Sequence, residues 1–420
     1  MSEYYYWEEP KEPTFEDFKR IVGKYFKVVK SSIAPGTGIP TFTIEPLEGI
    51  RSPEFMKEWK EGELKRIFNA LADELDEYKH YPFLRHQGTF PVFGMASNIP
   101  TPTGQKSDEL ILRLLPQKKE KPKKRRINKN AILFILTIGT VMGAAIFLLI
   151  SDLYVLFFDT SAAYFLGMIV AYTVAIMTII GVHESGHMFA CRRHKIKSSY
   201  PYFIPFFPPL GTMGALIVQK SPPKNKDQLF DVGLTGPYFG FLVTVIVCII
   251  GYALTLAFTN AQVIGATGAS IEQLSGMQFP DPLLFRILEL FLLENIPYNV
   301  FITAPGGSMV YMLHIIAFAG WIGCFVTGLN LFPIGQLDGG HVSRAMFGDK
   351  YYKYVAYVAF VGMIFINWLM AFLVLILSGM RFDHPGPLND VSPLSKSRKI
   401  ISISFLVVFI LTIPMGSFWF

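Results

Sequence analysis

The sequence predicts a polytopic α-helical membrane protein, with about six transmembrane helices and a re-entrant β-hairpin, preceded by a small soluble α+β domain. Of its 420 residues, 51% are hydrophobic and 17% are charged, whereas soluble proteins carry about 25% charged residues. Several uncharged stretches reach the roughly 20 residues that a helix needs to cross a bilayer. The N-terminal part, in contrast, mixes charged and apolar residues as a soluble domain does.

The excess of positive charge points to a membrane surface. Much of the net charge of +6 comes from residues 118–126, KKEKPKKRR, directly before the first apolar stretch. Such a run is typical of a cytoplasmic anchor that lies against anionic lipid headgroups. Aromatic residues do not interrupt it, so the lipid bilayer is the expected partner and nucleic acid is not. The three cysteines have neither disulfide nor CxxC spacing and are interpreted as packing residues.

Residues 1–117 are expected to form the soluble domain, and residues 118–130 a basic juxtamembrane linker. Apolar residues recur with helical period from Glu54 to Tyr78, which predicts one amphipathic helix. Short strands are predicted at residues 41–44, 90–93 and 110–115. The N-terminus lacks the features of a signal peptide, so the first span is expected to act as an uncleaved anchor.

Residues 131–420 are expected to form the membrane domain, with its functional core at about 162–345. The spans are predicted at about 131–150, 162–191, 229–258, 309–332, 354–377 and 400–413. The positive-inside rule puts residues 1–130 and the basic tail at 192–197 on the cytoplasmic side of a prokaryotic cell membrane or an organelle membrane. Counting spans then puts the loop 379–399 outside, in conflict with its basic charge.

A zinc-binding pattern lies near the end of the second predicted span, in the residues HESGH. His183 and His187 are four apart, so on a helix they lie on one face and suit a single zinc ion. Glu184 is placed to accept a proton from the attacking water. Ionisable groups are costly inside a bilayer, which indicates a functional role.

A third ligand is needed, because a catalytic zinc site takes three protein ligands and leaves one position open. Proline and glycines at residues 333–340 open the fourth predicted span, and Asp338 lies on this broken backbone. Its predicted depth is close to that of the two histidines. His341 and His194 are the alternative third ligands.

An apolar but non-helical stretch lies between these two regions, at residues 200–220, where several prolines and glycines break any helix. Such backbone is tolerated at membrane depth only against protein or a water-filled cavity, so a hairpin toward the metal is expected. The alternative is a surface loop that touches lipid. The hairpin could hold an extended substrate along an edge strand at Gly214, Ala215, Leu216 and Ile217. Asn330 could donate a hydrogen bond to a substrate carbonyl, or make an ordinary interhelical hydrogen bond.

Two motifs together resemble a known family. His183–His187 (HESGH) and residues 330–339 (NLFPIGQLDG) are similar to the paired HExxH and NxxPxxxLDG signature of the site-2 protease family of intramembrane zinc metalloproteases. Gly236-Pro237 is similar to a further feature of that family. The stretch at 201–219 looks most like the branch that includes plastid and cyanobacterial members, which has no PDZ domain between the motifs. The resemblance covers about residues 131–378.

The resemblance implies one zinc ion held by His183, His187 and Asp338, with Glu184 as the catalytic acid and base. It also implies that the substrates are membrane proteins, cut within or next to a transmembrane segment in regulated intramembrane proteolysis. Two other functions remain open. One is a catalytically silent membrane scaffold of the same fold, and the other is an ion transporter that uses the His/Asp cluster.

Overall fold

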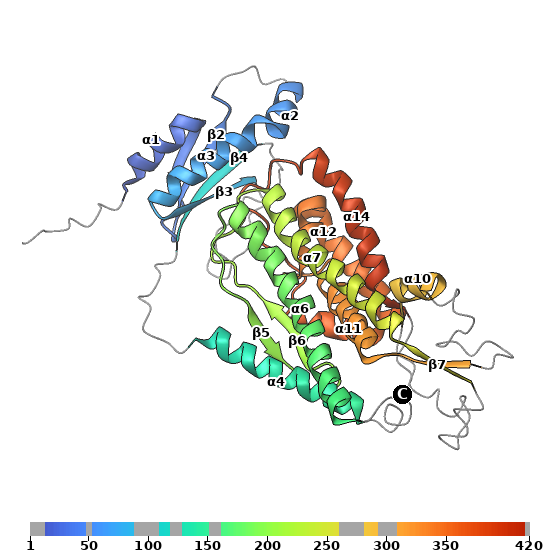
Figure 1. Ribbon diagram of the computed structural model, residues 1–420. Coiled ribbons are helices and arrows are strands. Elements are labelled where there is room, and N and C mark those ends of the chain that lie inside the picture. Colours follow the sequence, from blue (N-terminus) through green and yellow to red (C-terminus); the bar gives the residue numbers. More distant parts are fainter. Residues whose placement is uncertain are drawn as a thin grey trace, which may run out of the picture. The chain divides into compact units, whose positions relative to one another are not determined.

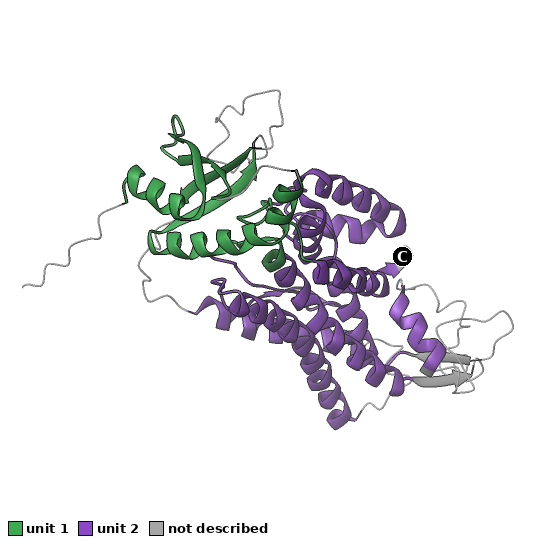
Figure 2. Ribbon diagram, turned by 90° about the horizontal axis from the view of Figure 1, so that it is seen from above, with its two compact units in different colours: residues 1–123, 222–229, 385–395 green, residues 124–221, 230–384, 396–420 purple. Residues whose placement is uncertain are grey.

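The computed structural model describes residues 13–47, 53–87, 109–117, 128–150, 161–259, 281–292 and 309–415. The chain divides into two compact units, which Figure 2 colours separately. Unit 1 comprises residues 1–123, 222–229 and 385–395, and unit 2 comprises residues 124–221, 230–384 and 396–420. The strand predicted at 90–93 and nearly all of the basic linker lie outside the described residues.

Unit 1 is built on a four-stranded antiparallel sheet in the order β1-β2-β4-β3 (Figure 1). Its strands are β1 (Lys27–Ile33), β2 (Pro40–Glu45), β3 (His80–His86) and β4 (Leu110–Pro116). Alternate residues of β2 and β4 are buried, among them Phe42 and Leu112, and they pack with α1 (Phe15–Tyr25) and α3 (Glu63–Glu77) in one apolar core. The helix α1 begins at a capping box, in which Thr14 and Asp17 exchange hydrogen bonds.

The single helix predicted from Glu54 to Tyr78 is wrong in one respect, because it is two helices. The structure ends α2 (Pro53–Glu61) and begins α3 (Glu63–Glu77) on either side of Gly62. Gly62 adopts φ −114° and ψ −68°, and glycine is the residue that most weakens a helix interior after proline. The apolar periodicity continues across Gly62, so the periodicity did not reveal the break.

Unit 1 also includes two segments that are distant in the sequence. Leu388 is 2% exposed and belongs to the same apolar core as Phe42 and Leu112. The backbone N–H of Leu84 in β3 donates to the carbonyl of Leu388 at 2.9 Å. Residues 385–395 therefore complete the fold of the N-terminal unit.

Unit 2 is mainly helical. Three of its described helices are long and apolar enough to cross a membrane: α4 (Lys129–Leu149), α6 (Ala162–Arg193) and α7 (Lys226–Ala253), the last of which begins in unit 1. They agree with the first three predicted spans. The remaining helices are α10 (Leu283–Leu292), α11 (Ile315–Asn330), α12 (Asp338–Ile366), α13 (Trp368–Leu377) and α14 (Lys396–Thr412). Two-stranded sheets pair β7 (Leu256–Thr259) with β9 (Met309–Met312), and β8 (Asp281–Pro282) with β10 (Pro414–Met415).

The fifth predicted span, 354–377, is wrong as a single helix. The backbone of Asn367 is extended between α12 and α13, and its side chain accepts a hydrogen bond from the N–H of Met370, which begins α13. The chain after α13 returns to the start of α12, because His384 contacts His341 there. The loop that follows α13 therefore lies beside the first turns of α12. The span count, which put the loop 379–399 on the opposite side of the membrane from that end of α12, was wrong.

The hairpin expected between the two motifs is present as β5 (Tyr202–Pro205) and β6 (Thr212–Leu216), which pair antiparallel. Gly211 closes the turn with φ +75°, a conformation that favours glycine. A Cβ on Gly211 would lie 2.8 Å from Cα of Val141 in α4, so this turn packs directly on the first long helix.

Candidate metal centre

Three side chains from two helices meet at one point in unit 2. Nε2 of His183 and Nε2 of His187 each lie 3.2 Å from Oδ2 of Asp338. The two Nε2 atoms lie 3.2 Å from one another. Within the described residues, this is the one group of three or more histidine, cysteine or acidic side chains close enough to hold a metal ion together.

Helix α6 supplies the two histidines by its own geometry. They are four residues apart, so they project from the same face of the helix, one turn from each other. His183 and His187 are both 5% exposed, and Glu184 is 3% exposed. The two histidines and Glu184 are thus buried, whereas the Asp338 side chain is 15% exposed.

Asp338 reaches the histidines because the chain is not helical just before it. The helix α11 ends at Asn330, and α12 begins at Asp338 with Leu337 as its N-cap. The break is tightly packed around two glycines, since a Cβ on Gly339 would overlap the carbonyl of Leu331, and a Cβ on Gly340 would overlap that of Gly335.

Glycines of α7 let this helix approach the site closely. A Cβ on Gly236 would overlap the imidazole of His187, and one on Gly240 would lie 2.9 Å from Nδ1 of His183. One on Gly233 would lie 2.7 Å from the carbonyl oxygen of Asp338. The GxxxG spacing in α7 is therefore used to pack against all three donor residues.

A backbone carbonyl of α7 also orients one of the histidines. Nδ1 of His187 lies 2.8 Å from the carbonyl oxygen of Val232, which can only accept, so Nδ1 carries the proton. Nε2 then keeps its lone pair for a metal ion. Such hydrogen bonds behind a ligand fix both its tautomer and its orientation.

The donor set fits zinc. With bonds of about 2.0–2.2 Å, two ligands of a tetrahedral zinc ion are about 3.3 Å apart, close to the separations between these three atoms. Two imidazoles and one carboxylate are borderline and hard donors that zinc accepts. In addition, Oε2 of the buried Glu184 has no hydrogen-bond partner among the described residues. That oxygen is available to a group at the site.

The two alternative third ligands lie elsewhere. Nδ1 of His341 lies 2.5 Å from Nε2 of His384. Nε2 of His194 lies 2.8 Å from Oδ2 of Asp231 and is half-buried, although it follows the exposed Arg192 and Arg193. Neither histidine belongs to the group of three donors.

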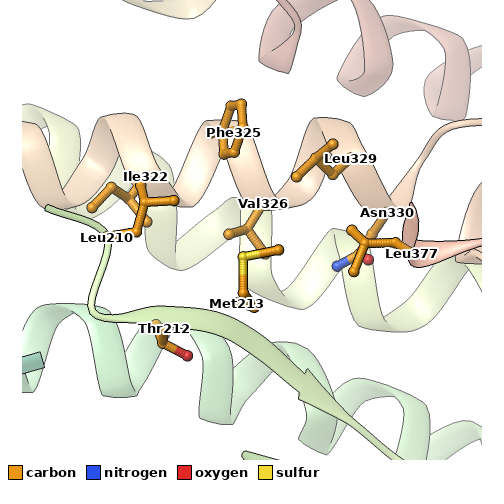
Figure 3. Close-up of a pocket in the computed structure, with 9 residues that line it drawn as sticks. All are labelled: Leu210, Thr212, Met213, Ile322, Phe325, Val326, Leu329, Asn330 and Leu377. Carbon is orange, nitrogen blue, oxygen red and sulfur yellow. The ribbon is translucent and has the colours of Figure 1, made fainter. Parts of the chain in front are cut away.

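Asn330 and the hairpin line the same small pocket. Figure 3 shows Asn330 at one end, on α11, with Val326 and Ile322 further along the helix and Thr212 and Met213 of β6 opposite. A Cβ on Gly214 would lie 3.8 Å from Cγ1 of Val326, so the hairpin runs alongside α11. Ala215 and Leu216 pair with Phe203 and Tyr202 of β5, whereas Ile217 follows the end of β6.

Two supporting residues were missed in the sequence. The role of Val232 depends on its backbone carbonyl. Every residue has such a carbonyl, so the residue type does not reveal the role. Gly236 was noted only together with Pro237, as similar to a feature of the family. The glycine spacing of three and four residues from Gly233 to Gly240 was the signal that one face of α7 lies against the histidines.

Comparison with known proteins points to one family. Residues 171–376 match peptidase family M50. "Probable zinc metalloprotease EGY1, chloroplastic" of Oryza sativa subsp. japonica is 29% identical over 257 residues, which are 59% of this chain and 40% of the relative. The protein of the same name from Arabidopsis thaliana is 27% identical over 249 residues, 57% of this chain and 42% of the relative.

A third relative, "Probable zinc metallopeptidase EGY3, chloroplastic" of Arabidopsis thaliana, is 28% identical over 177 residues, 41% of this chain and 29% of the relative. The matched part of the chain spans about two fifths of the length of the first two relatives. No solved structure matches the chain.

Proposed function

This chain carries a domain of peptidase family M50, the site-2 protease family, and we propose that it is a membrane protease that hydrolyses peptide bonds within or next to transmembrane segments of other proteins. The observation that carries this proposal is the group of His183, His187 and Asp338, whose donor atoms are spaced for zinc beside the unpaired carboxylate oxygen of Glu184. The long apolar helices make it a membrane protein.

His183, His187 and Asp338 would hold the metal. When bound, zinc would lower the pKa of a water molecule to about 7 and polarise the carbonyl to be cut. Val232 keeps the proton of His187 on Nδ1, so that Nε2 remains a ligand. Burial of His183, Glu184 and His187 strengthens the electrostatic interactions among them.

Glu184 is the proposed proton carrier. It precedes Ser185 on the same turn of α6, and its Oε2 is buried without a hydrogen-bond partner among the described residues. A carboxylate in this position accepts the proton of the attacking water and then donates it to the leaving amine. A catalytically silent scaffold has no need of a free carboxylate beside a complete donor set.

The substrate is proposed to lie between the hairpin and α11. Peptide bonds of a helix are shielded by their own hydrogen bonds, so a spanning segment must unwind before it is cut. One edge of β6 pairs with β5, and within the described residues no strand pairs with its other edge, where an extended chain could add. The small pocket beside it has mainly apolar walls, and the amide of Asn330 at its end could bind a substrate carbonyl.

The membrane setting completes the proposal. We place the hairpin at membrane depth, with about six crossings in total and the zinc site close to the cytoplasmic or equivalent face. The N-terminal domain would lie on that same face, as the basic residues at 118–126 indicate. The membrane is that of a prokaryotic cell or an organelle, and chloroplastic relatives favour a plastid among organelles.

The test is cleavage of a single-span protein by the purified chain in liposomes. We expect products whose new termini, mapped by mass spectrometry, lie within or next to the spanning segment. Removal of metal by a chelator should stop cleavage, and added zinc should restore it. Cleavage that continues in the metal-free protein, or that occurs only in soluble loops far from the membrane, would exclude the proposed function.

A further inference from the structure

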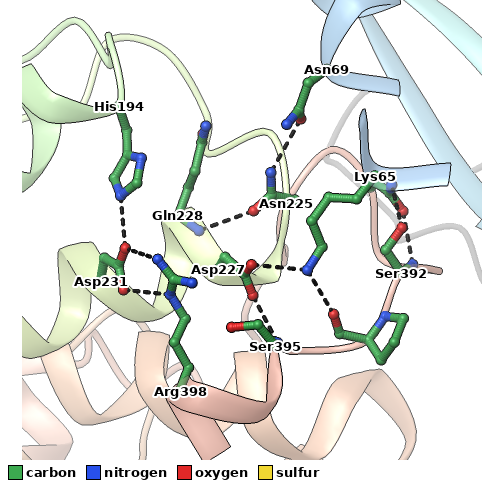
Figure 4. A network of polar contacts seen from close by, with 12 residues as sticks. Lys65, Asn69, His194, Asn225, Asp227, Gln228, Asp231, Ser392, Ser395 and Arg398 are labelled. Carbon is green, nitrogen blue, oxygen red and sulfur yellow. Dashed lines mark hydrogen bonds and ion pairs between the residues drawn. The ribbon is translucent and has the colours of Figure 1, made fainter. Parts of the chain in front are cut away.

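A second polar cluster of unit 2 lies one residue away from the carbonyl that orients His187. Its members are His194 at the end of α6, Asp231 in α7 and Arg398 in the first turn of α14 (Figure 4). Asp231 directly precedes Val232 in the chain. The cluster therefore joins three helices at the base of the proposed metal site.

The carboxylate of Asp231 receives three hydrogen bonds. Nε of Arg398 donates to Oδ1 at 2.7 Å, and Nη2 donates to Oδ2 at 2.5 Å. Nε2 of His194 lies 2.8 Å from Oδ2. Bidentate arginine–carboxylate pairs fix geometry as well as charge, because two parallel bonds prevent rotation of either group. The Arg398 and Asp231 side chains are only 24% and 22% exposed, so solvent screens the pair weakly.

These contacts set the register of α7 against α6. His194 lies seven residues after His187, which is about two turns further along the same helix. Asp231 also accepts, through its backbone carbonyl, a hydrogen bond from the Thr235 hydroxyl at 2.9 Å. A Cβ on Gly186 would lie 2.5 Å from the Thr235 carbonyl oxygen, so the two helices touch at this turn.

We infer that Asp231 and Arg398 are positioning residues for the metal site, which act on His187 through the carbonyl of Val232. The bond from Arg398 holds α7 from one side, and the bond from His194 ties it to α6. Together they keep the Val232 carbonyl within 2.8 Å of Nδ1 of His187. Without them α7 can slide or rotate, and His187 loses its fixed ring orientation. This inference rests on the proposed metal site.

The test measures metal binding, because a purely structural role would not change it. The variants are Asp231→Asn, Arg398→Gln and Arg398→Lys, and the matched control is Lys399→Gln, whose side chain is exposed on the same turn of α14. Loss of hydrogen bonds behind a ligand typically lowers metal affinity about 10–100-fold. We expect the zinc dissociation constant to rise about tenfold in Asp231→Asn and Arg398→Gln, the low end of that range.

Arg398→Lys keeps the charge but loses the bidentate pair, so its zinc affinity should lie between that of wild type and Arg398→Gln. The visible absorption spectrum of the Co²⁺-substituted protein should shift in the same order. The melting temperature of the metal-free protein is measured for each variant, so that zinc affinity is compared only between folded proteins. Lys399→Gln should behave as wild type. Should Asp231→Asn fail to fold, the two Arg398 variants decide the question by the same measurements.

Wild-type zinc affinity and an unchanged Co²⁺ spectrum in folded Arg398→Gln would overturn the inference. Cleavage of substrate is measured in parallel but does not decide this point. If the variants lose zinc as expected and wild type cleaves no spanning substrate, the positioning role stands and the proposed function fails.

Discussion

A Cβ atom on Gly236 would overlap the imidazole ring of His187, because α7 crosses α6 directly over this histidine. Only a glycine leaves room for the ring in the orientation that points Nε2 toward Asp338. The close approach also brings the carbonyl of Val232 to Nδ1 of the same ring. One glycine thus makes both the position and the tautomer of His187, a proposed metal ligand, possible.

Gly236→Ala is therefore expected to displace the His187 ring and lower zinc affinity by at least about tenfold, as loss of the hydrogen bond behind a ligand does. The measurement is a zinc titration against a competing chelator. The control is Gly181→Ala on α6, two residues before His183, where an added Cβ meets nothing within 4 Å. That variant should bind zinc normally and gain up to about 1 kcal/mol of helix stability. Equal zinc affinity in both variants would contradict the packing described.

Ile217→Pro is expected to slow cleavage by up to about tenfold, by loss of one main-chain hydrogen bond worth up to about 1.5 kcal/mol. Both the N–H and the carbonyl of Val218 bond to Ser199, on the side of β5. Because a strand alternates, the N–H of Ile217 faces the opposite edge, where the substrate is proposed to pair. Proline removes that N–H.

The matched control for this change is Ile217→Val, which keeps the N–H and most of the apolar side chain. Both variants should retain a full complement of zinc, measured by atomic absorption. Unchanged cleavage by Ile217→Pro, at normal zinc content, would exclude pairing of substrate with this edge.

Arg85→Met is expected to destabilise unit 1 by at least about 3 kcal/mol. The Arg85 side chain is 1% exposed and donates to the carbonyls of Leu388 and Pro387, at 2.7 Å each. Its loss removes the side-chain donor from both carbonyls, of which that of Leu388 keeps only the N–H of Leu84. Hydrogen exchange of the β3 and β4 amides should accelerate about 100-fold. Arg66→Met, at a side chain that is 82% exposed, should change exchange little.

The stability of α10 should depend on pH through Glu289. Burial, together with the nearby carboxylate of Asp281, raises the pKa of Glu289 from 4.5 to about 6, although Arg286 opposes this. The folded state therefore binds the proton more tightly than the unfolded state. The stabilisation is fully present below about pH 4.5 and is lost as the pH rises through 6.

The measurement is hydrogen exchange of α10 between pH 4 and about 7, corrected for the intrinsic exchange rate. Glu289→Gln cannot titrate, so its corrected protection should be nearly independent of pH over this interval. A variant that keeps the wild-type pH dependence would show that another group is responsible.

The family resemblance and the three long apolar helices α4, α6 and α7 could be predicted because their signals are local in the sequence. His183 and His187 share one helix face by spacing alone, and the break before Asp338 follows from Pro333 and the adjacent glycines. The resemblance is confirmed by the match to peptidase family M50 over residues 171–376. The metal-binding and catalytic roles of these residues stay predictions.

Features that depend on distant partners could not be predicted. Asp231 and Arg398 are 167 residues apart, and neither side chain stands out in its own neighbourhood. Arg85 and Leu388 are 303 residues apart in the sequence. The inclusion of residues 385–395 in the N-terminal unit therefore could not be predicted from the sequence. The turn at Asn367 was missed for a different reason, because apolar residues on both sides read as one span.

The most direct test of the account is the zinc content and the activity of Glu184→Gln measured on the same preparation. Glu184 is not one of the three donors, so the variant should bind one zinc ion per chain, as wild type does. Because it lacks the group that accepts and returns the proton, cleavage of a single-span substrate should fall below detection. Retained cleavage would contradict the proposed mechanism, and loss of zinc would contradict a site made of His183, His187 and Asp338.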